Sequence, residues 1–399
     1  MVDRICEAPV PPPVSPRLTE MLGAQYPIVA FSHCRDVVAA VTRAGGFGVL
    51  GAVAFPPEIL DRELTWIDGE VGDRAYGVDI LLPAAYEGRE RGGLDVGSAT
   101  GLLPEEHRAF VRDLLERYGV PPLPGGGTNH PGAHPGATLL RASERGGRDL
   151  VDVALGHPKV RLVANALGPA PDWLVETAHG RGLLVAGLVG TVEHARRQRV
   201  AGVDIVVAQG YEAGGHTGTV STMVLVPQVV DAVAPVPVLA AGGIADGRQV
   251  AAALALGAKG VWCGSVWLTT REAETHPVVV EKMLAADSTQ TVRSRSLTGK
   301  PARQLESAWT REWDDSSHPD PLPLPLQGVL VAEAQARIGR SAATTPGSRE
   351  LVNYFVGQVV GQMDAVRPAR QVVQDMVEGY VDTIAELARA VEEEDGPGA

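Results

Sequence analysis

Two glycine-rich stretches decide the fold: residues 204–218 read DIVVAQGYEAGGHTG, and residues 236–264 read VPVLAAGGIADGRQVAAALALGAKGVWCG. Within the second stretch, the apolar runs 236–241 and 259–263 are too short for helices and predict buried strands, each followed by glycine. Residues 246–256 between them predict a helix that an aspartate caps and a glycine ends. This order is that of a parallel βαβ unit, whose glycine turns lie at the carboxyl ends of the strands.

The glycine turns predict a phosphate site. Glycine lets the backbone approach a ligand closely because no Cβ intrudes, and the amides at the start of a helix favour an anion. Two such turns after neighbouring strands can hold one phosphate between them. A tight turn without a ligand is the alternative explanation of a single glycine pair. The second turn and the EAGGH segment together favour the ligand.

The same rhythm of strand and helix recurs along the first two thirds of the chain. Eight strands are predicted to begin near residues 27, 48, 75, 160, 183, 204, 236 and 259. Eight alternating units predict an α/β fold, a (β/α)8 TIM barrel over residues 21–265. An open doubly wound sheet is the alternative, because a sequence does not show whether a sheet closes.

Other segments do not follow this alternation of strand and helix, and they predict regions outside the barrel. We expect an extended N-terminal arm (1–20), an insertion in the barrel (about 83–136), a mostly helical substrate or cap region (266–366) and a final helix with a short acidic tail (367–399). Within the cap, residues 301–313 and 351–362 are interpreted as helices. The final helix is expected to pack back on the barrel.

Composition narrows the class of protein. The net charge of −13 argues against nucleic acid and anionic membranes as partners. Three widely spaced cysteines exclude a disulfide framework and a cysteine-rich metal site, and they fit a cytoplasmic protein. No apolar run reaches the ~18 residues that a membrane span needs. A homodimer is expected only because dimers are the commonest assembly.

The motifs AQGYEAGGHTG, VPVLAAGGIADGRQVAAALALGAKGVWCGS and RSLTGKPARQL together resemble the nitronate monooxygenase (2-nitropropane dioxygenase-like) family. They are also similar to its relative, the flavin-containing enoyl-acyl-carrier-protein reductase. The resemblance covers roughly residues 27–303. It implies an FMN-binding TIM barrel with a helical substrate domain, hence a flavoprotein oxidoreductase.

The resemblance also implies roles for individual residues. His216 matches the active-site histidine, which suits a proton-transfer role because histidine titrates near neutral pH. The residues expected to hold the FMN phosphate are Gly242, Gly243, Gly264 and Ser265. The residues expected along the flavin are Gln209, Ala213, Gly214 and Gly215. Two sites depart from the family pattern: Ser32 and His33 replace Pro and Met, and Asp79 replaces an Asn as an expected flavin contact.

Several further residues have two interpretations. His33 and Cys34 either face the flavin or are ordinary loop and core residues, and Asp79 either contacts the flavin or caps a strand end. Glu212 is expected to make structural hydrogen bonds. A solvated helix face is favoured over binding a substrate anion for Arg295, Lys300 and Arg303. Core or cap packing is expected for Trp262 and Trp267, and no metal site is predicted.

Three functions are compatible with these motifs. The first is an FMN-dependent monooxygenase that oxidises alkyl nitronates or nitroalkanes with O2 to carbonyl compounds and nitrite. The second is an NAD(P)H-dependent FMN reductase of an enoyl or enone thioester. The third is a non-redox barrel that binds a phosphorylated metabolite, which the paired glycine turns alone would allow.

Overall fold

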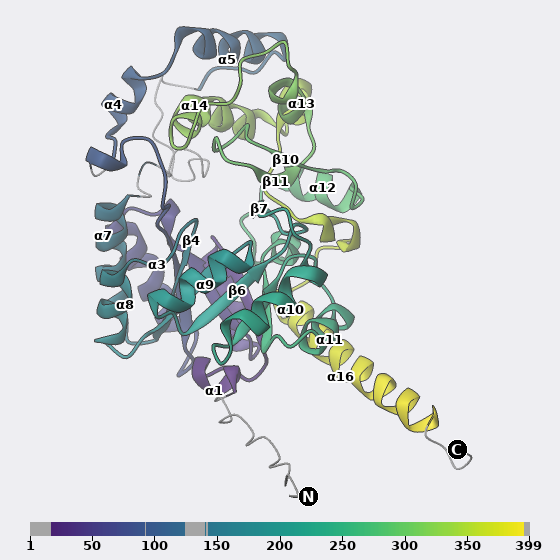
Figure 1. Ribbon diagram of the computed structural model, residues 1–399. Helices are drawn as coiled ribbons and strands as arrows, with labels where there is room; N and C mark the ends of the chain where they lie inside the picture. The colour runs from purple at the N-terminus through teal and green to yellow at the C-terminus, as the bar shows by residue number, and fades with distance from the viewer. Residues whose placement is uncertain (1–16, 92, 124–139, 141–142, 395–399) are drawn as a thin grey trace, which may run out of the picture.

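The predicted strands close into a barrel. The computed structural model describes residues 17–91, 93–123, 140 and 143–394. Eight parallel strands follow one another around the barrel in chain order: β1 (Ile28–Ser32), β2 (Phe47–Gly51), β3 (Tyr76–Leu81), β4 (Val160–Ala166), β5 (Leu184–Val189), β6 (Ile205–Gln209), β8 (Val238–Ala241) and β9 (Gly260–Cys263). The ring closes where β1 pairs with β9, with Ile28 opposite Val261. The predicted TIM barrel is confirmed, and the open sheet is wrong (Figure 1).

Helices connect the strands and surround the barrel (Figure 1). They are α2 (Arg35–Arg43), α3 (Pro57–Glu70), α7 (Glu144–Leu155), α8 (Asp172–His179), α9 (Val192–Ala201), α10 (Thr222–Val233) and α11 (Gly247–Ala255). The start of α11 shows how local sequence sets a boundary. The Asp246 carboxylate accepts a hydrogen bond from the Gln249 amide (3.0 Å), and the Gln249 side chain accepts one from the Asp246 amide (3.1 Å). This reciprocal capping box satisfies amides that a helix start leaves unpaired.

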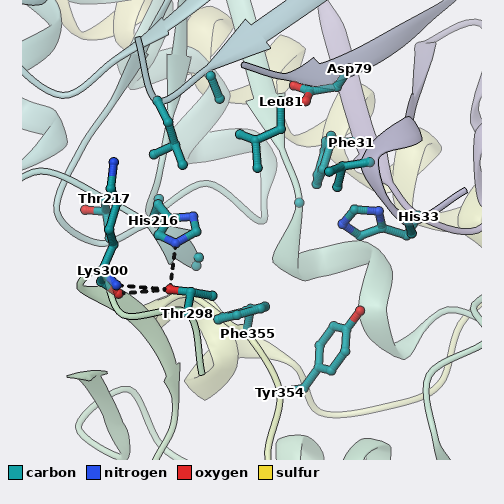
Figure 2. Close-up of a pocket in the computed structure, with 18 of the residues that line it drawn as sticks. Phe31, His33, Asp79, Leu81, His216, Thr217, Thr298, Lys300, Tyr354 and Phe355 are labelled. Carbon is teal, nitrogen blue, oxygen red and sulfur yellow. Dashed lines mark hydrogen bonds between the residues drawn. The ribbon is translucent and has the colours of Figure 1, made fainter. Parts of the chain in front are cut away.

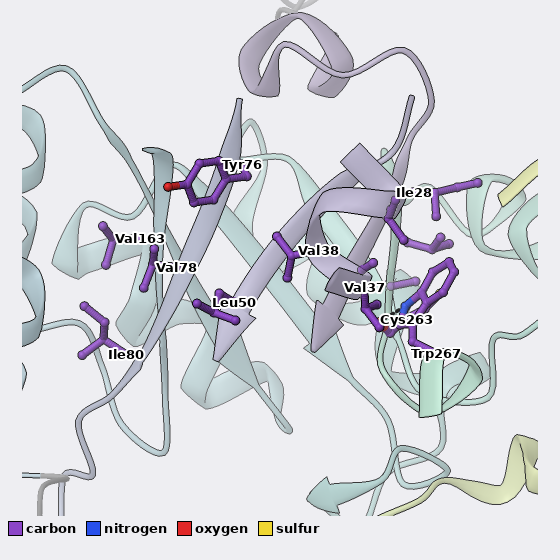
Figure 3. Packing of buried hydrophobic residues seen from close by; sticks show 14 of the residues in the cluster. Ile28, Val37, Val38, Leu50, Tyr76, Val78, Ile80, Val163, Cys263 and Trp267 are labelled. Carbon is purple, nitrogen blue, oxygen red and sulfur yellow. Dashed lines mark hydrogen bonds between the residues drawn. The ribbon is translucent and has the colours of Figure 1, made fainter. Parts of the chain in front are cut away.

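Two apolar clusters hold the barrel together. The larger lies between the strands and the surrounding helices, where Val37 and Val38 of α2 pack near Leu50 of β2 (Figure 3). The smaller fills the barrel interior, and helix α1 (Leu18–Leu22) contributes Leu18 and Leu22 to it. The expected extended arm is therefore wrong from residue 18 onward, because these leucines are buried. Residues 1–16 of that arm lie outside the described residues.

A second layer, the cap, lies over the carboxyl ends of the barrel strands (Figure 1). Its helices are α4 (Val96–Gly101), α5 (Glu105–Arg117), α12 (Pro277–Ala285), α13 (Ala308–Asp314), α14 (Leu326–Ser341) and α15 (Pro346–Leu351), with 3₁₀ turns η2 (Arg89–Arg91), η5 (Ser265–Thr269) and η6 (Gln358–Gln362). Helices α4 and α5 come from the predicted insertion and contact α14. Residues 124–136 of that insertion lie outside the described residues.

The cap contains a small antiparallel sheet that the sequence reading missed. Its strand order is β10 (Thr291–Ser294), β11 (Ala302–Leu305) and β7 (Gly215–His216). The helix predicted over 301–313 is wrong for residues 302–305, which form β11, and is confirmed for residues 308–313, which lie in α13. The helix predicted over 351–362 is also wrong, because α15 ends at Leu351 and the chain then extends to bridge β11 through Phe355. In both places tertiary strand pairing overrides local helix propensity.

The final helix, α16 (Ala369–Glu394), returns to the barrel and packs on α11 and α2, as predicted (Figure 1). It approaches α11 closely because two glycines, Gly247 and Gly379, face each other at the crossing. None of the helices in the described ranges is long and apolar enough to cross a membrane.

Candidate active site

A deep cavity opens at the carboxyl ends of the barrel strands, beneath the cap. Its volume is about 2210 Å³. Every residue that the sequence assigned to the site lines this cavity: Asp79, Gln209, Ala213, Gly214, Gly215, His216, Gly242, Gly243, Gly264 and Ser265. The structure therefore brings the ten residues together, while their individual roles stay predictions.

The predicted phosphate-binding residues form one corner of the cavity. Gly242 and Gly243 have φ values of 94° and 73°, which residues with a Cβ rarely adopt. Among the described residues, the backbone N–H groups of Gly243 and Gly264 have no hydrogen-bond acceptor. The Ser265 hydroxyl accepts a bond from the Gly357 amide (2.8 Å), so its own hydrogen is available to a ligand. This corner offers several donors to an oxyanion.

The source of these donors differs from the prediction in one respect. The sequence predicts that backbone amides at the start of the helix after residue 243 donate hydrogen bonds to the phosphate. In the structure, the Asp246 carboxylate is the N-cap of α11 and accepts the bond from the Gln249 amide there. The donors therefore belong to the turns after β8 and β9, not to the first turn of α11.

The glycine-rich segment 210–215 is tied to both the barrel and the cap. The Glu212 carboxylate accepts bonds from the amide and the hydroxyl of Thr222 (both 2.9 Å), which confirms its predicted structural role. The Glu212 carbonyl accepts a bond from the Gln358 amide (2.9 Å). A Cβ added to Gly214 would lie 2.8 Å from the Gly357 nitrogen, so glycine is required for this contact. The sequence reading missed Gly357 because it assigned that segment to a helix.

His216 is held by the cap sheet, not by a free loop. It lies on β7, opposite Ala302 of β11. Its Nε2 lies 2.9 Å from the Thr298 hydroxyl oxygen, and that hydroxyl donates to the Lys300 carbonyl (3.1 Å) and accepts from the Lys300 amide (3.3 Å) (Figure 2). A hydroxyl has one hydrogen and two acceptor positions. When that hydrogen goes to the Lys300 carbonyl, His216 donates from Nε2–H and keeps an unprotonated Nδ1.

The surroundings of His216 keep the imidazole neutral. Burial, and secondly the nearby Lys300 ammonium, lower the pKa of His216 to about 4. In the ligand-free site the His216 imidazole is therefore neutral at neutral pH, while its part in proton transfer stays a prediction. Above pH ~4 one ring nitrogen carries a free lone pair that can accept a proton, and the lowered pKa makes the imidazole a weak base.

Asp79 lies within β3, two residues before its last residue Leu81, and its side chain lines the same cavity (Figure 2). It is only 7% exposed, and among the described residues its carboxyl group has no hydrogen-bond partner. Burial raises the pKa of Asp79 to about 7. A carboxyl group in this position changes charge at physiological pH.

We expect Asp79→Asn to stabilise the protein at pH 8 and to have little effect at pH 4. The folded state holds the Asp79 proton up to pH ~7, whereas the unfolded chain releases it near 3.8. Stability therefore falls as pH rises through this window, by at most about 4 kcal/mol. Thermal unfolding of both proteins at pH 4, 6 and 8, with equal flavin content, measures the difference. A stability gap that does not change with pH would contradict the assigned titration.

His33 and Cys34 also line the cavity, and both make local bonds. The His33 Nδ1–H donates to the Gly51 carbonyl (3.1 Å), and burial lowers the pKa of this imidazole. The Cys34 thiol donates to the Glu272 carbonyl (3.0 Å), and burial raises the pKa of the thiol. Because both groups are kept neutral and bonded, the structure favours a structural role for them over a catalytic one.

The solvated helix face expected for Arg295, Lys300 and Arg303 is wrong. Arg303 is 2% exposed on β11, where it donates to the Tyr211 carbonyl and stacks on the Tyr211 ring. Arg295 donates to the carbonyls of Gly299 and Pro321. Only Lys300 lines the cavity.

The packing role predicted for the two tryptophans is confirmed. Trp262 contributes to the cluster inside the barrel, and Trp267 belongs to the cluster between strands and helices. The Trp267 indole N–H donates to the Cys263 carbonyl at 2.7 Å, which satisfies its buried polar atom.

Comparisons with known proteins agree with this architecture. The family model described as nitronate monooxygenase matches residues 136–379. The chain is 61% identical to a Mycobacterium tuberculosis protein assigned only provisionally as a monooxygenase, over 94% of this chain and 99% of that protein. It is 31% identical to a Staphylococcus saprophyticus protein named as a nitronate monooxygenase, over 80% of this chain and 88% of that protein.

Two solved structures are similar over nearly their full length. The nitroalkane oxidase from Streptomyces ansochromogenes matches with a TM-score of 0.74 and 25% identity, over 92% of this chain and 99% of the other. FabK from Thermotoga maritima matches with a TM-score of 0.67 and 27% identity, over 94% and 98% respectively.

Proposed function

Because the chain belongs to the nitronate monooxygenase family and is thus an oxidoreductase, we propose that it is an FMN-dependent enzyme that oxidises alkyl nitronates or nitroalkanes with O2 to carbonyl compounds and nitrite. The observation that carries the proposal is the convergence of a donor-rich oxyanion corner and a neutral, oriented histidine in one cavity. FMN, when bound, supplies the redox chemistry. The protein binds and orients the reactants and handles the proton.

Gly264 supports the fit of FMN phosphate to this corner. Its backbone has φ −117°, which any residue adopts, so conformation does not require glycine here. A Cβ at this position would have only Phe31 within 4 Å, at 3.9 Å, so packing within the protein does not require glycine either. That Cβ would enter the cavity beside the Gly264 N–H. The space is therefore best explained by a ligand that approaches this amide.

We expect Gly264→Ala to weaken FMN binding about 10-fold or more while leaving the thermal stability of the FMN-free protein unchanged. The added methyl group occupies ligand space and clashes with nothing in the protein. Quenching of FMN fluorescence measures affinity, and thermal unfolding measures stability. Gly101→Ala, in a helix of the cap with open space around it, is a matched control that should leave FMN affinity unchanged. Unchanged FMN affinity in Gly264→Ala would remove Gly264 from the cofactor site.

His216 and Thr298 carry out the proton handling in this proposal. Thr298 fixes the imidazole with Nε2–H bonded and Nδ1 free. The free Nδ1 accepts the acidic proton from the carbon beside a nitro group, which produces the nitronate within the site. The resulting imidazolium then lies beside the anion it has formed. Thr298 acts through His216 and is a positioning residue.

A reductase is the second candidate, because the similarity to FabK extends over almost the whole chain. In that case NAD(P)H would dock at the same face, and an enoyl or enone thioester would be the substrate. The cap, including residues 266–366, would form the substrate domain in either case. We further propose a cytoplasmic homodimer.

One experiment separates the two candidates. The purified protein, loaded with FMN, is mixed without oxygen with a nitronate in one series and with NADH or NADPH in the other. Loss of oxidised-flavin absorbance with the nitronate alone supports the monooxygenase. Loss of that absorbance with NADH or NADPH alone supports the reductase. A protein that does not bind FMN at all would contradict both.

A further inference from the structure

We propose that Lys300 is the residue by which this site recognises anionic substrates, and that its ammonium group binds the oxygen atoms of the nitronate beside His216. This inference rests on the proposed function, because that function identifies the bound anion as a nitronate. It assigns a specificity-determining role to a residue that the sequence alone placed on a solvated surface.

The backbone holds Lys300 at a fixed place next to the histidine. Both its amide and its carbonyl bond to the Thr298 hydroxyl, at 3.3 and 3.1 Å. Gly299 precedes it with φ 82°, and a Cβ there would lie 2.2 Å from the Leu322 carbonyl oxygen. The turn therefore has little freedom to move. The Lys300 side chain extends past Thr217 on the same side of the cavity as His216 (Figure 2).

Lys300 has no anionic partner in the part of the chain that the structure describes. Burial lowers the pKa of Lys300, and no carboxylate acts to raise it. The carboxylates that line the cavity are Asp79, Asp95, Glu63, Glu212, Glu274 and Glu333. Of these, Glu212 is bonded to Thr222, and Asp79 lies across the cavity on β3 (Figure 2). A partly buried ammonium without a counter-ion is an incomplete pair, which an anionic ligand completes.

A second cation lies at the same corner. Arg293 lines the cavity and donates from one terminal nitrogen to the Thr217 carbonyl (3.0 Å). Its Nε is buried and has no hydrogen-bond partner among the described residues. Its guanidinium therefore adds a second positive charge to the lining of this cavity.

His216 cannot supply this charge to a nitronate that arrives from solution. Its imidazole is neutral above pH ~4, and its free Nδ1 presents a lone pair that repels an anion. A permanent positive charge must then come from another group. Lys300 is a cation next to this histidine, because the Lys300 amide and the His216 Nε2 both contact the same Thr298 hydroxyl group. Because Lys300 is half-buried, its ammonium group stabilises a bound anion more than it would in bulk solvent.

The test uses nitrate, a planar monoanion that resembles the nitronate head group and cannot react. Calorimetric titration of the FMN-loaded protein measures its affinity. We expect Lys300→Met, which keeps the length of the side chain and removes the charge, to weaken nitrate binding at least 10-fold. Lys300→Arg should retain the affinity within about 3-fold. Lys259→Met, an exposed lysine that does not line the cavity, is the control for the change in net charge.

The outcomes separate this inference from the proposed function. Equal nitrate affinity in the Lys300→Met variant and the unsubstituted protein would overturn it, whatever the protein oxidises. Lys300-dependent nitrate binding without any nitronate oxidation would keep the anion site and reject the monooxygenase. When both hold, the Lys300→Met variant should also show a raised KM for the nitronate, while the KM for the neutral nitroalkane is little changed.

Discussion

We expect His216→Asn to lower kcat/KM for a neutral nitroalkane by about 100-fold or more while FMN stays bound. The substitution removes the basic imidazole nitrogen that, in the proposed arrangement, stays free when Nε2–H bonds to Thr298. Asn keeps a polar side chain of similar reach and has no basic nitrogen. The residues assigned to the FMN phosphate lie on other turns, after β8 and β9, so cofactor affinity should not change.

Two comparisons sharpen this prediction. The loss should be much smaller with a preformed nitronate, because that substrate has already lost the proton that Nδ1 would remove. His194→Asn should have little effect, since His194 is an exposed cavity residue on α9. Steady-state oxygen consumption, measured with the neutral nitroalkane and with the nitronate, gives the loss of kcat/KM for each substrate. Full activity of His216→Asn on the neutral nitroalkane would exclude His216 from proton transfer.

Most of the barrel could be predicted because its signals are local. The strands predicted from apolar runs begin within two residues of the observed ones, as for β4 at Val160 and β8 at Val238. Each run is followed by a turn whose glycine conformation or helix cap is encoded within a few residues, such as Asp246. Barrel closure is not local, and it was inferred only from the count of units.

The cap was predicted less well because its sheet joins segments far apart in the chain. Strand β7 has only two residues, Gly215 and His216, and its partner β11 lies more than 80 residues later. Neither segment has a long enough alternation of apolar and polar residues to predict a strand by itself. Their pairing nevertheless brings Thr298 and Lys300 close to the histidine. The sequence indicated His216 through its motif, whereas Thr298 lies within the motif RSLTGKPARQL and received no role of its own.

The electrostatics of the site also needed the structure. A histidine near the surface would titrate at its ordinary pKa, and an aspartate at a strand end would stay ionised. Burial reverses both expectations, lowering the pKa of His216 to about 4 and raising that of Asp79 to about 7. Desolvation depends on which atoms surround a group, and these come here from the barrel and the cap together.

Gly247→Ala should destabilise the protein by about 3 kcal/mol or more, although helix propensity alone predicts the opposite. Gly247 is the first residue of α11, where alanine is the better helix former. Its Cβ would lie 2.3 Å from the backbone carbon of Gly379 and the backbone nitrogen of Tyr380. Backbone atoms of α16 cannot rotate away as a flexible side chain would. The two helices must separate, which opens apolar contacts of Val373 and Met376 with the barrel.

A second glycine supplies the matched control for this prediction. Gly69 lies inside α3 with nothing within 4 Å of an added Cβ. Gly69→Ala should therefore stabilise the protein by roughly 0.5–1 kcal/mol, as propensity predicts. Thermal unfolding measures the stability of both variants, and limited proteolysis follows the release of α16. If the crossing of α11 and α16 requires glycine at position 247, Gly247→Ala lowers the unfolding temperature and Gly69→Ala raises it. If Gly247→Ala instead matches Gly69→Ala, the contact between α11 and α16 is loose enough to accept a methyl group, and the close packing of the final helix on the barrel is wrong.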